Sequence, residues 1–406
     1  MKRILFLSFL LPAMAFAQDK GIHFEHGTSW ADVQAKAKAE NKYIFVDCFT
    51  TWCGPCKMMS NTIFPQEKVG DYMNSKFVSV KVQMDQTSKD NDDVKNWYAT
   101  AKQIEKDYSI RAYPTFLVFA PDGHVVDRQV GGADADGFIK RCEASLDPAN
   151  QYYTQLDRYK KGQQDTAFLR QLALLALTKY DQENASEVAK LYISKQKNLY
   201  TPGNLDLLSK FTSKSTDPGF DVFLHNAARV DKVLGAGKAE AKVMEVAANE
   251  DVYPQLMKNG QGAPDWDGVE KTVKAKYPSI AEELMLKVKV QYYSYIKDAD
   301  KAVANIVAYM KKYGHKASSQ ELNEYAWTIF EKCNDKACIE QALEWSKRSF
   351  KEQEVPAYMD TYANLLYKSG KKTDALAWEE KALNKANDTE KKNYQDTLEK
   401  MKKGEM

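Results

Sequence analysis

The sequence has no excess of charge of either sign. It holds 58 lysines and arginines against 56 aspartates and glutamates over 406 residues. A chain this close to neutral has no long-range field that would attract nucleic acid or an anionic membrane, so we predict no nucleic-acid partner. The length exceeds what a single hydrophobic core usually organises, and two or more domains are therefore expected.

Long hydrophobic runs are also missing, apart from one near the amino terminus. Two basic residues precede the apolar stretch Ile4–Leu11, and Ala15-Phe16-Ala17 has the small-x-small pattern of a signal-peptide cleavage site. The stretch is too short for a stable membrane span, although an uncleaved anchor is the alternative. We interpret residues 1–17 as a signal peptide cleaved after Ala17. This predicts a periplasmic protein with no membrane span after signal cleavage.

Cysteine is scarce, with six residues in the whole chain. So few cannot cross-link a chain of this length, and each must be interpreted from its surroundings. Cys48 falls in a β-prone run and Cys142 in a predicted helix, so both are interpreted as packed free thiols. The five histidines are scattered and none neighbours a cysteine motif. We therefore predict no metal and no cofactor.

Strand and helix signals alternate only in the first third of the chain. The predicted strands are 43–46, 77–84, 115–120 and 125–130, and the predicted helices begin after Ser29, follow a cysteine motif with an interruption near Pro65, and cover 138–146. After Asp147 only helical periodicity remains. We predict a first domain at 18–148, a helical domain at 149–315, and helix pairs at 316–406 that continue it.

The last hundred residues contain a weak internal repeat. Tyr325-Ala326 and Phe330 match Tyr362-Ala363 and Tyr367 at an offset of 37, while Ala342-Leu343 and Trp345 match Ala375-Leu376 and Trp378 at an offset of 33. This period is that of a helix pair and resembles tetratricopeptide repeats, with four extra residues expected in the inter-helix turn of the first copy. A protein-binding surface and a helical extension that binds nothing are both open interpretations.

Two cysteines, Cys333 and Cys338, fall in that expected expansion. In an exported protein their spacing predicts a small structural disulfide. A second redox pair is the alternative, but no Trp-Cys-Gly-Pro context supports it.

The strongest chemical signal in the sequence is the motif Trp52-Cys53-Gly54-Pro55-Cys56-Lys57. A helix amino terminus stabilises a thiolate, so a Cys-x-x-Cys pair after a buried strand favours thiol–disulfide exchange. Cys53 is the predicted exposed nucleophile and Cys56, about one turn further, the resolving thiol. Gly54 and Pro55 keep the turn tight and start the helix. A zinc site would need further ligands nearby, and a purely structural disulfide is the remaining alternative.

Other residues between 21 and 147 resemble the thioredoxin family. Asp47, on the strand before the motif, matches the family's buried acid, and Lys81, on the next strand, matches its lysine partner. The resemblance implies that Asp47 takes the proton of Cys56 when that thiol attacks a mixed disulfide.

The same resemblance covers a substrate groove. Tyr113-Pro114 looks like the family's cis-proline loop, and Gly131 matches the glycine that keeps the groove shallow, with Trp52 at its border. The implied fold is an α/β thioredoxin fold, a central mixed sheet flanked by helices, followed here by an all-α, helical-repeat-like domain.

The segment after the motif resembles one subfamily in particular. Phe64, Val69 and residues 74–80 are more like a thioredoxin-like subfamily with a broken helix after the motif, which includes the soluble carboxy-terminal domain of a bacterial membrane electron transporter. The chain differs from a simple thioredoxin in two features. Gln86–Gln103 is an insertion with a helical apolar face, and the helical half after Asp147 is foreign to that family.

These observations predict a thiol–disulfide oxidoreductase that reduces or isomerises protein disulfides. Its partners would be protein thiols and disulfides and an upstream electron donor, and the helical domain would select among them. The alternative is a helical scaffold or binding protein whose thioredoxin domain has a regulatory or structural role.

Overall fold

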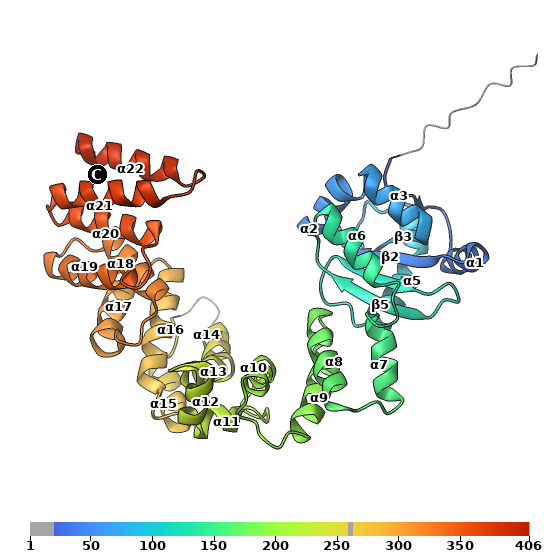
Figure 1. The fold of residues 1–406 in the computed structure, drawn as a ribbon, viewed down its shortest axis with the longest axis horizontal. Helices are drawn as coiled ribbons and strands as arrows, with labels where there is room; N and C mark the ends of the chain where they lie inside the picture. Colours follow the sequence, from blue (N-terminus) through green and yellow to red (C-terminus); the bar gives the residue numbers. More distant parts are fainter. Residues whose placement is uncertain (1–19, 259–262, 406) are drawn as a thin grey trace, which may run out of the picture. The chain divides into compact units, whose positions relative to one another are not determined.

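The computed structural model describes residues 20–258 and 263–405, and the predicted signal peptide lies outside these ranges. The chain divides into two compact units, the first ending at Leu199 and the second starting at Tyr200. Figure 1 shows a sheet in the first unit and helices throughout the second. In the two described ranges no helix is long and apolar enough to cross a membrane. The domain boundaries expected at 148 and 315 stay predictions.

The described part of the first unit is built on a five-stranded mixed sheet with the strand order β1-β3-β2-β4-β5. Strands β1 and β2 run parallel to β3, whereas β4 runs antiparallel to β2 and to β5. In chain order the elements are β1 (Phe24–Glu25), α1 (Trp30–Glu40), β2 (Tyr43–Phe49), α2 (Gly54–Met58), the π-helix η1 (Met59–Ile63), α3 (Glu67–Lys76), β3 (Phe77–Gln83), α4 (Asp92–Asn96), α5 (Tyr98–Asp107), β4 (Thr115–Phe119), β5 (Val125–Val130), α6 (Ala135–Ala144), α7 (Tyr152–Lys160), α8 (Thr166–Thr178) and α9 (Gln182–Ser194).

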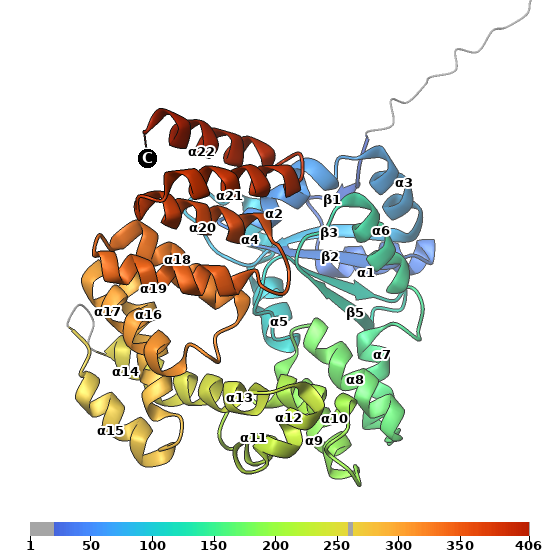
Figure 2. The ribbon, with the colours of Figure 1, turned by 60° about the vertical axis from the view of Figure 1, so that its left-hand side comes forward.

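Helices cover both faces of this sheet, which explains why its strands are almost continuously apolar. Phe45 and Phe116 lie in one buried cluster with residues of η1, α3 and α6. Ile44 and Leu117, which alternate with them along β2 and β4, lie in a second cluster with residues of α1 and α5. Figure 2 shows this arrangement of helices around the strands. The predicted mixed sheet flanked by helices is confirmed.

Local sequence signals account for several element boundaries. Ser29 caps α1 and forms a reciprocal capping box with Asp32, as their spacing predicts. The helix after the cysteine motif is interrupted before Pro65, also as predicted. The interruption takes the form of the π-helical turn η1, closed by a hydrogen bond of 2.9 Å from Phe64 N–H to the Met59 carbonyl.

Helices α7 and α8 are joined to the sheet by a buried ion pair. Lys179, at the end of α8, places its Nζ 2.9 Å from Oδ1 of Asp127 on β5. The same carboxylate accepts hydrogen bonds from Ser145 Oγ at 2.7 Å and from the Tyr152 amide at 3.1 Å. These contacts show why α7 and α8 fold with the first unit rather than with the helical chain that follows.

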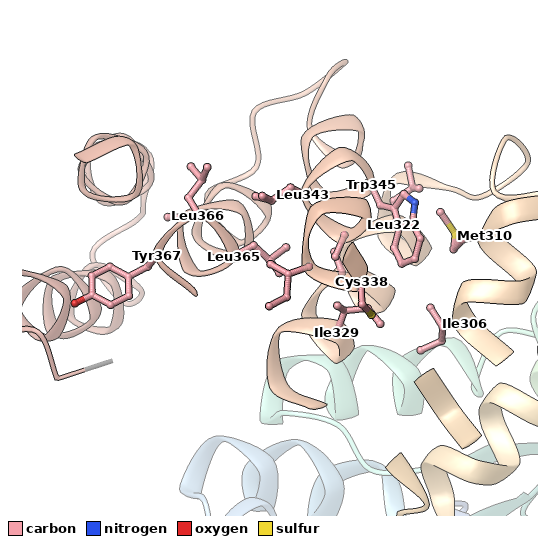
Figure 3. Close-up of a cluster of buried hydrophobic side chains, with 14 of the residues drawn as sticks. Ile306, Met310, Leu322, Ile329, Cys338, Leu343, Trp345, Leu365, Leu366 and Tyr367 are labelled. Atoms are coloured by element: carbon pink, nitrogen blue, oxygen red, sulfur yellow. The ribbon is translucent and has the colours of Figure 1, made fainter. Parts of the chain in front are cut away.

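The described part of the second unit is entirely helical. It contains α10 (Pro202–Phe211), α11 (Phe220–His225), α12 (Ala227–Leu234), α13 (Lys238–Ala247), the π-helix η2 (Ala248–Val252), α14 (Tyr253–Lys258), α15 (Trp266–Lys276), α16 (Ala281–Tyr295), α17 (Ala299–Tyr313), α18 (Ser319–Lys332), α19 (Lys336–Ser349), α20 (Pro356–Lys368), α21 (Lys372–Lys385) and α22 (Lys391–Lys403). Figure 3 shows part of the buried cluster that joins α17 to α20, with Ile306, Leu322, Leu343 and Leu365 among its members.

The helix pairs α18–α19 and α20–α21 correspond to the two copies of the predicted repeat. One detail of that prediction is wrong. Both inter-helix turns have the same length, residues 333–335 in the first copy and 369–371 in the second. The four extra residues instead lengthen the ends of α18 and α19 that flank the turn.

Candidate active site

Cys53 and Cys56 form a disulfide at the start of α2. Cys53 is the residue that caps the helix, and its Sγ accepts a hydrogen bond of 3.1 Å from the Cys56 amide. Their Cα atoms lie 5.3 Å apart, and Pro55 occupies the first turn, where its missing N–H costs nothing. The pair is therefore covalently linked in the way that the motif predicts.

The accessibility of Cys53 differs from the prediction of an exposed nucleophile. Its exposed fraction is 3% in this oxidised form. The residues around it are open to solvent: Gly54, Pro55 and Lys57 are exposed, and Trp52 is 69% exposed. The disulfide is thus recessed within a solvent-accessible rim.

The loop before the motif is held by a residue that the sequence did not single out. Asp85, just after β3, accepts a hydrogen bond of 2.9 Å from the Thr51 amide and a second one from the Thr51 hydroxyl. Gln83 donates to the Asp85 carbonyl and to Asp90 of the insertion, at 3.0 Å each. The insertion is therefore connected to the loop that carries Trp52 only indirectly, through Gln83 and Asp85. No local signal distinguishes Asp85 from other loop aspartates.

The proline loop lies beside the motif. The Tyr113–Pro114 peptide bond is cis, and the Tyr113 ring makes an edge contact with Trp52 at 5.9 Å between centroids. Gly131 donates its N–H to the Pro114 carbonyl at 2.9 Å and has a φ of 82°, a conformation that favours glycine. The structure thus brings together the four residues that the resemblance assigns to a groove.

Asp47 and Lys81 face each other on neighbouring strands. They are paired in register, and Lys81 Nζ donates to Asp47 Oδ2 at 2.7 Å and to Ser60 Oγ at 2.8 Å. Asp47 is 2% exposed, and its Oδ1 has no hydrogen-bond partner among the described residues. Burial raises the pKa of this carboxyl above its usual range, while Lys81 opposes the rise. Because strand side chains alternate, Asp47 shares the sheet face of Phe45, which contacts η1.

The other cysteines are separate from this site. Cys48 and Cys142 are buried free thiols, as predicted, and burial raises the pKa of each well above its usual value. Neither is poised to react at neutral pH.

Cys333 and Cys338 are free thiols in the described structure, so the disulfide predicted between them is not formed here. Cys333 follows α18, and Cys338 lies in the first turn of α19, in the buried cluster of Figure 3. Burial raises the pKa of Cys338 to about 12, and a hydrogen bond with the Cys333 side chain acts in the same direction. The two thiols are close enough to share a hydrogen bond, and the disulfide between them stays a prediction.

A redox-active Cys-x-x-Cys pair, a cis-proline loop beside it and a buried acid on a mixed sheet define a thioredoxin-like protein. Comparison with known proteins agrees, because residues 30–145 match the thioredoxin-like domain family. The chain is 33% identical over 107 residues to a thioredoxin of Mycoplasmoides gallisepticum. The match covers 87% of that thioredoxin and 26% of this chain. It belongs to the thioredoxin family.

Two further relatives are similar to part of this chain. Thioredoxin-2 of Pyricularia oryzae is 35% identical over 95 residues, which are 23% of this chain and 44% of that protein. The solution structure of a proposed disulphide-isomerase from Bacteroides thetaiotaomicron is 37% identical, with a TM-score of 0.27, and the match covers 32% of this chain and 98% of that one. The chain thus spans less than half the length of the Pyricularia relative, and each match covers no more than about a third of this chain.

Proposed function

We propose that the chain is an exported thiol–disulfide oxidoreductase that reduces or isomerises protein disulfides through Cys53 and Cys56. One observation carries the proposal: the Cys53–Cys56 disulfide opens α2 beside the Trp52–Tyr113 contact and the cis bond to Pro114.

Cys53 is the attacking thiolate. In the reduced chain, the Cys56 amide that donates to Cys53 Sγ at 3.1 Å stabilises negative charge on that sulfur. The thiolate attacks one sulfur of the substrate disulfide, and the other sulfur leaves as a thiolate that takes up a proton. Cys56 then loses its proton and attacks Cys53, which releases the second substrate sulfur. The substrate gains two electrons and two protons, and the chain is left with its own disulfide.

Asp47 is the proposed acceptor of the Cys56 proton, and Lys81 is its partner. The buried carboxyl has a raised pKa and an unpartnered Oδ1 among the described atoms, which suits a group that takes up a proton and returns it. Tyr113, Pro114 and Gly131 are the proposed substrate groove, bordered by the exposed indole of Trp52.

Each reduction consumes the reduced form of the chain, so an upstream dithiol must regenerate it. We expect this donor, and protein disulfides as substrates, to be the redox partners. Signal cleavage after Ala17 and a periplasmic location belong to the same proposal, and an amino terminus at Gln18 in the exported protein would support them. The helical region from residue 200 onward is the proposed partner-selecting part.

Two experiments test this proposal. The full chain should catalyse insulin reduction by dithiothreitol, whereas Cys53→Ser should abolish the catalysis. Equal activity of the two proteins would contradict the proposal.

In the exporting cell, Cys56→Ala should trap substrates as mixed disulfides at Cys53. The trapped set should change when residues 200–406 are removed. Absence of catalysis, together with partners that bind the helical region without a disulfide, would favour the scaffold alternative.

A further inference from the structure

The ammonium group of Lys81 lies among three phenylalanine rings. Its Nζ is 5.2 Å from the ring centre of Phe24, 4.7 Å from that of Phe49 and 5.1 Å from that of Phe64. These distances are within the range of cation–π attraction. The Lys81 side chain is only 23% exposed, so the charge is held in place rather than fully hydrated.

Two oxygen atoms complete this surrounding. Lys81 Nζ donates to Asp47 Oδ2 at 2.7 Å and to Ser60 Oγ at 2.8 Å. Ser60 lies four residues after Cys56 in the π-helix η1, and Phe64 closes the same π-helical turn through its amide. One segment, directly after the redox motif, therefore supplies both an oxygen and a ring to Lys81. The sequence carried no signal for Ser60, because the contact depends on this π-helical turn.

We propose that Ser60 is a positioning residue that, with the three phenylalanine rings, holds the Lys81 ammonium against Asp47 and so controls how readily that carboxylate accepts a proton from Cys56. The inference rests on the proposed function, because it assigns Ser60 a part in the Cys56 step.

The direction of the effect follows from the charges. Burial raises the pKa of Asp47, and Lys81 is the charged group that lowers it. Without the Ser60 hydroxyl, one Lys81 N–H loses its acceptor, and the partly exposed side chain can turn toward water. The ammonium then stabilises the Asp47 carboxylate less, so the pKa of Asp47 rises further and proton uptake from Cys56 shifts to higher pH.

Other ionisable groups near Lys81 do not replace Ser60. A cavity of about 200 Å³ beside Lys81 is lined by Glu25, His26 and Asp93. Glu25 is already paired with Lys36 at 2.7 Å, and the direct oxygen contacts of Lys81 within the described residues are those of Asp47 and Ser60.

The test is the pH dependence of Cys56 attack in the full chain. Reduced protein is mixed with 5,5′-dithiobis(2-nitrobenzoate) in a stopped-flow instrument: Cys53 releases the first thionitrobenzoate, and Cys56 attack releases the second. Ser60→Ala should move the inflection of the second rate to higher pH and slow that rate about threefold at pH values below the inflection, which corresponds to a rise of about half a pH unit. Ser60→Thr, which keeps the hydroxyl, should follow the wild type.

Two further variants keep the result interpretable. Ser75→Ala removes an exposed serine hydroxyl of the same unit and should change nothing, while Phe49→Leu removes the nearest ring and should move the inflection in the same direction as Ser60→Ala. Unmoved inflections in both Ser60→Ala and Phe49→Leu would overturn the proposal, and so would a Ser60→Thr profile equal to that of Ser60→Ala. If the wild type itself shows no second release, the proposed function fails instead.

Discussion

Replacement of Lys179 by methionine should destabilise the first unit strongly. The side chain of Lys179 is 9% exposed, and that of its partner Asp127 is 1% exposed. The substitution therefore leaves a buried carboxylate without its counter-charge. Breaking a buried ion pair costs about 3–5 kcal/mol. Asp127 keeps three neutral donors, Ser145 Oγ, Gln129 Nε2 and the Tyr152 amide. We therefore expect a loss at the lower end, about 3 kcal/mol of unfolding free energy.

The buried thiols of the first unit provide the assay. Cys48 and Cys142 are buried, so brief alkylation at increasing urea concentration, followed by mass spectrometry, reports the opening of this unit within the full chain. Lys68→Met breaks an exposed pair with Asp136 and serves as the matched control, with an expected change of at most about 1 kcal/mol.

A double-mutant cycle separates the pair from its surroundings. Asp127→Asn alone leaves the Lys179 charge buried, whereas the double variant leaves no buried charge, so the double variant should lose less than the sum of the two single losses. A Lys179→Met loss below about 1 kcal/mol, or additive losses in the cycle, would refute the reasoning. The result also matters for truncation, because a chain cut at Asp147 would expose Asp127, whereas a cut after Leu199 keeps the pair.

Three other predictions concern separate groups. Because burial raises the pKa of Asp47, ionising it costs stability, so the unfolding free energy of wild type should fall relative to that of Asp47→Asn as pH rises from 5 to 9 in urea titrations; a constant difference would contradict this. Asp85→Ala should lower Cys53 reactivity toward a small disulfide by roughly threefold, since Thr51 loses two hydrogen bonds, and an unchanged rate would show that the loop needs no such anchor. In air-oxidised protein, peptide mapping without reduction should find Cys333 linked to Cys338, and two free thiols there would end that prediction.

Much of the first unit could be predicted because its signals are local. The β-prone run at Tyr43 predicts a buried strand, and the Ser29–Asp32 spacing predicts the start of α1. The motif itself identifies Cys53 and Cys56, since few other arrangements explain two cysteines at that spacing before a helix. Family resemblance then supplied Asp47 and Pro114, whose roles no local pattern indicates.

The features that were missed depend on contacts between distant residues. Asp127 and Lys179 are 52 positions apart, and neither residue type at its position indicates an ion pair. Ser60 reaches Lys81 only because η1 is π-helical, and Pro65 predicts an interruption without predicting its form. Repeat offsets locate an insertion only between matched residues, so they do not distinguish the turn of the first helix pair from the helix ends that flank it. In the structure the extra residues lie in the two helix ends within that interval.

The most direct test of the central claim is to identify the cysteine that attacks a disulfide. Reduced Cys56→Ala protein is incubated with a peptide that contains one disulfide, the products are digested without reduction, and the adduct is mapped by mass spectrometry. The account predicts one stable mixed disulfide, at Cys53, with Cys48 and Cys142 unmodified. A dominant adduct at Cys333 or Cys338, or no adduct while the protein remains folded, would contradict the assignment of Cys53 as the nucleophile.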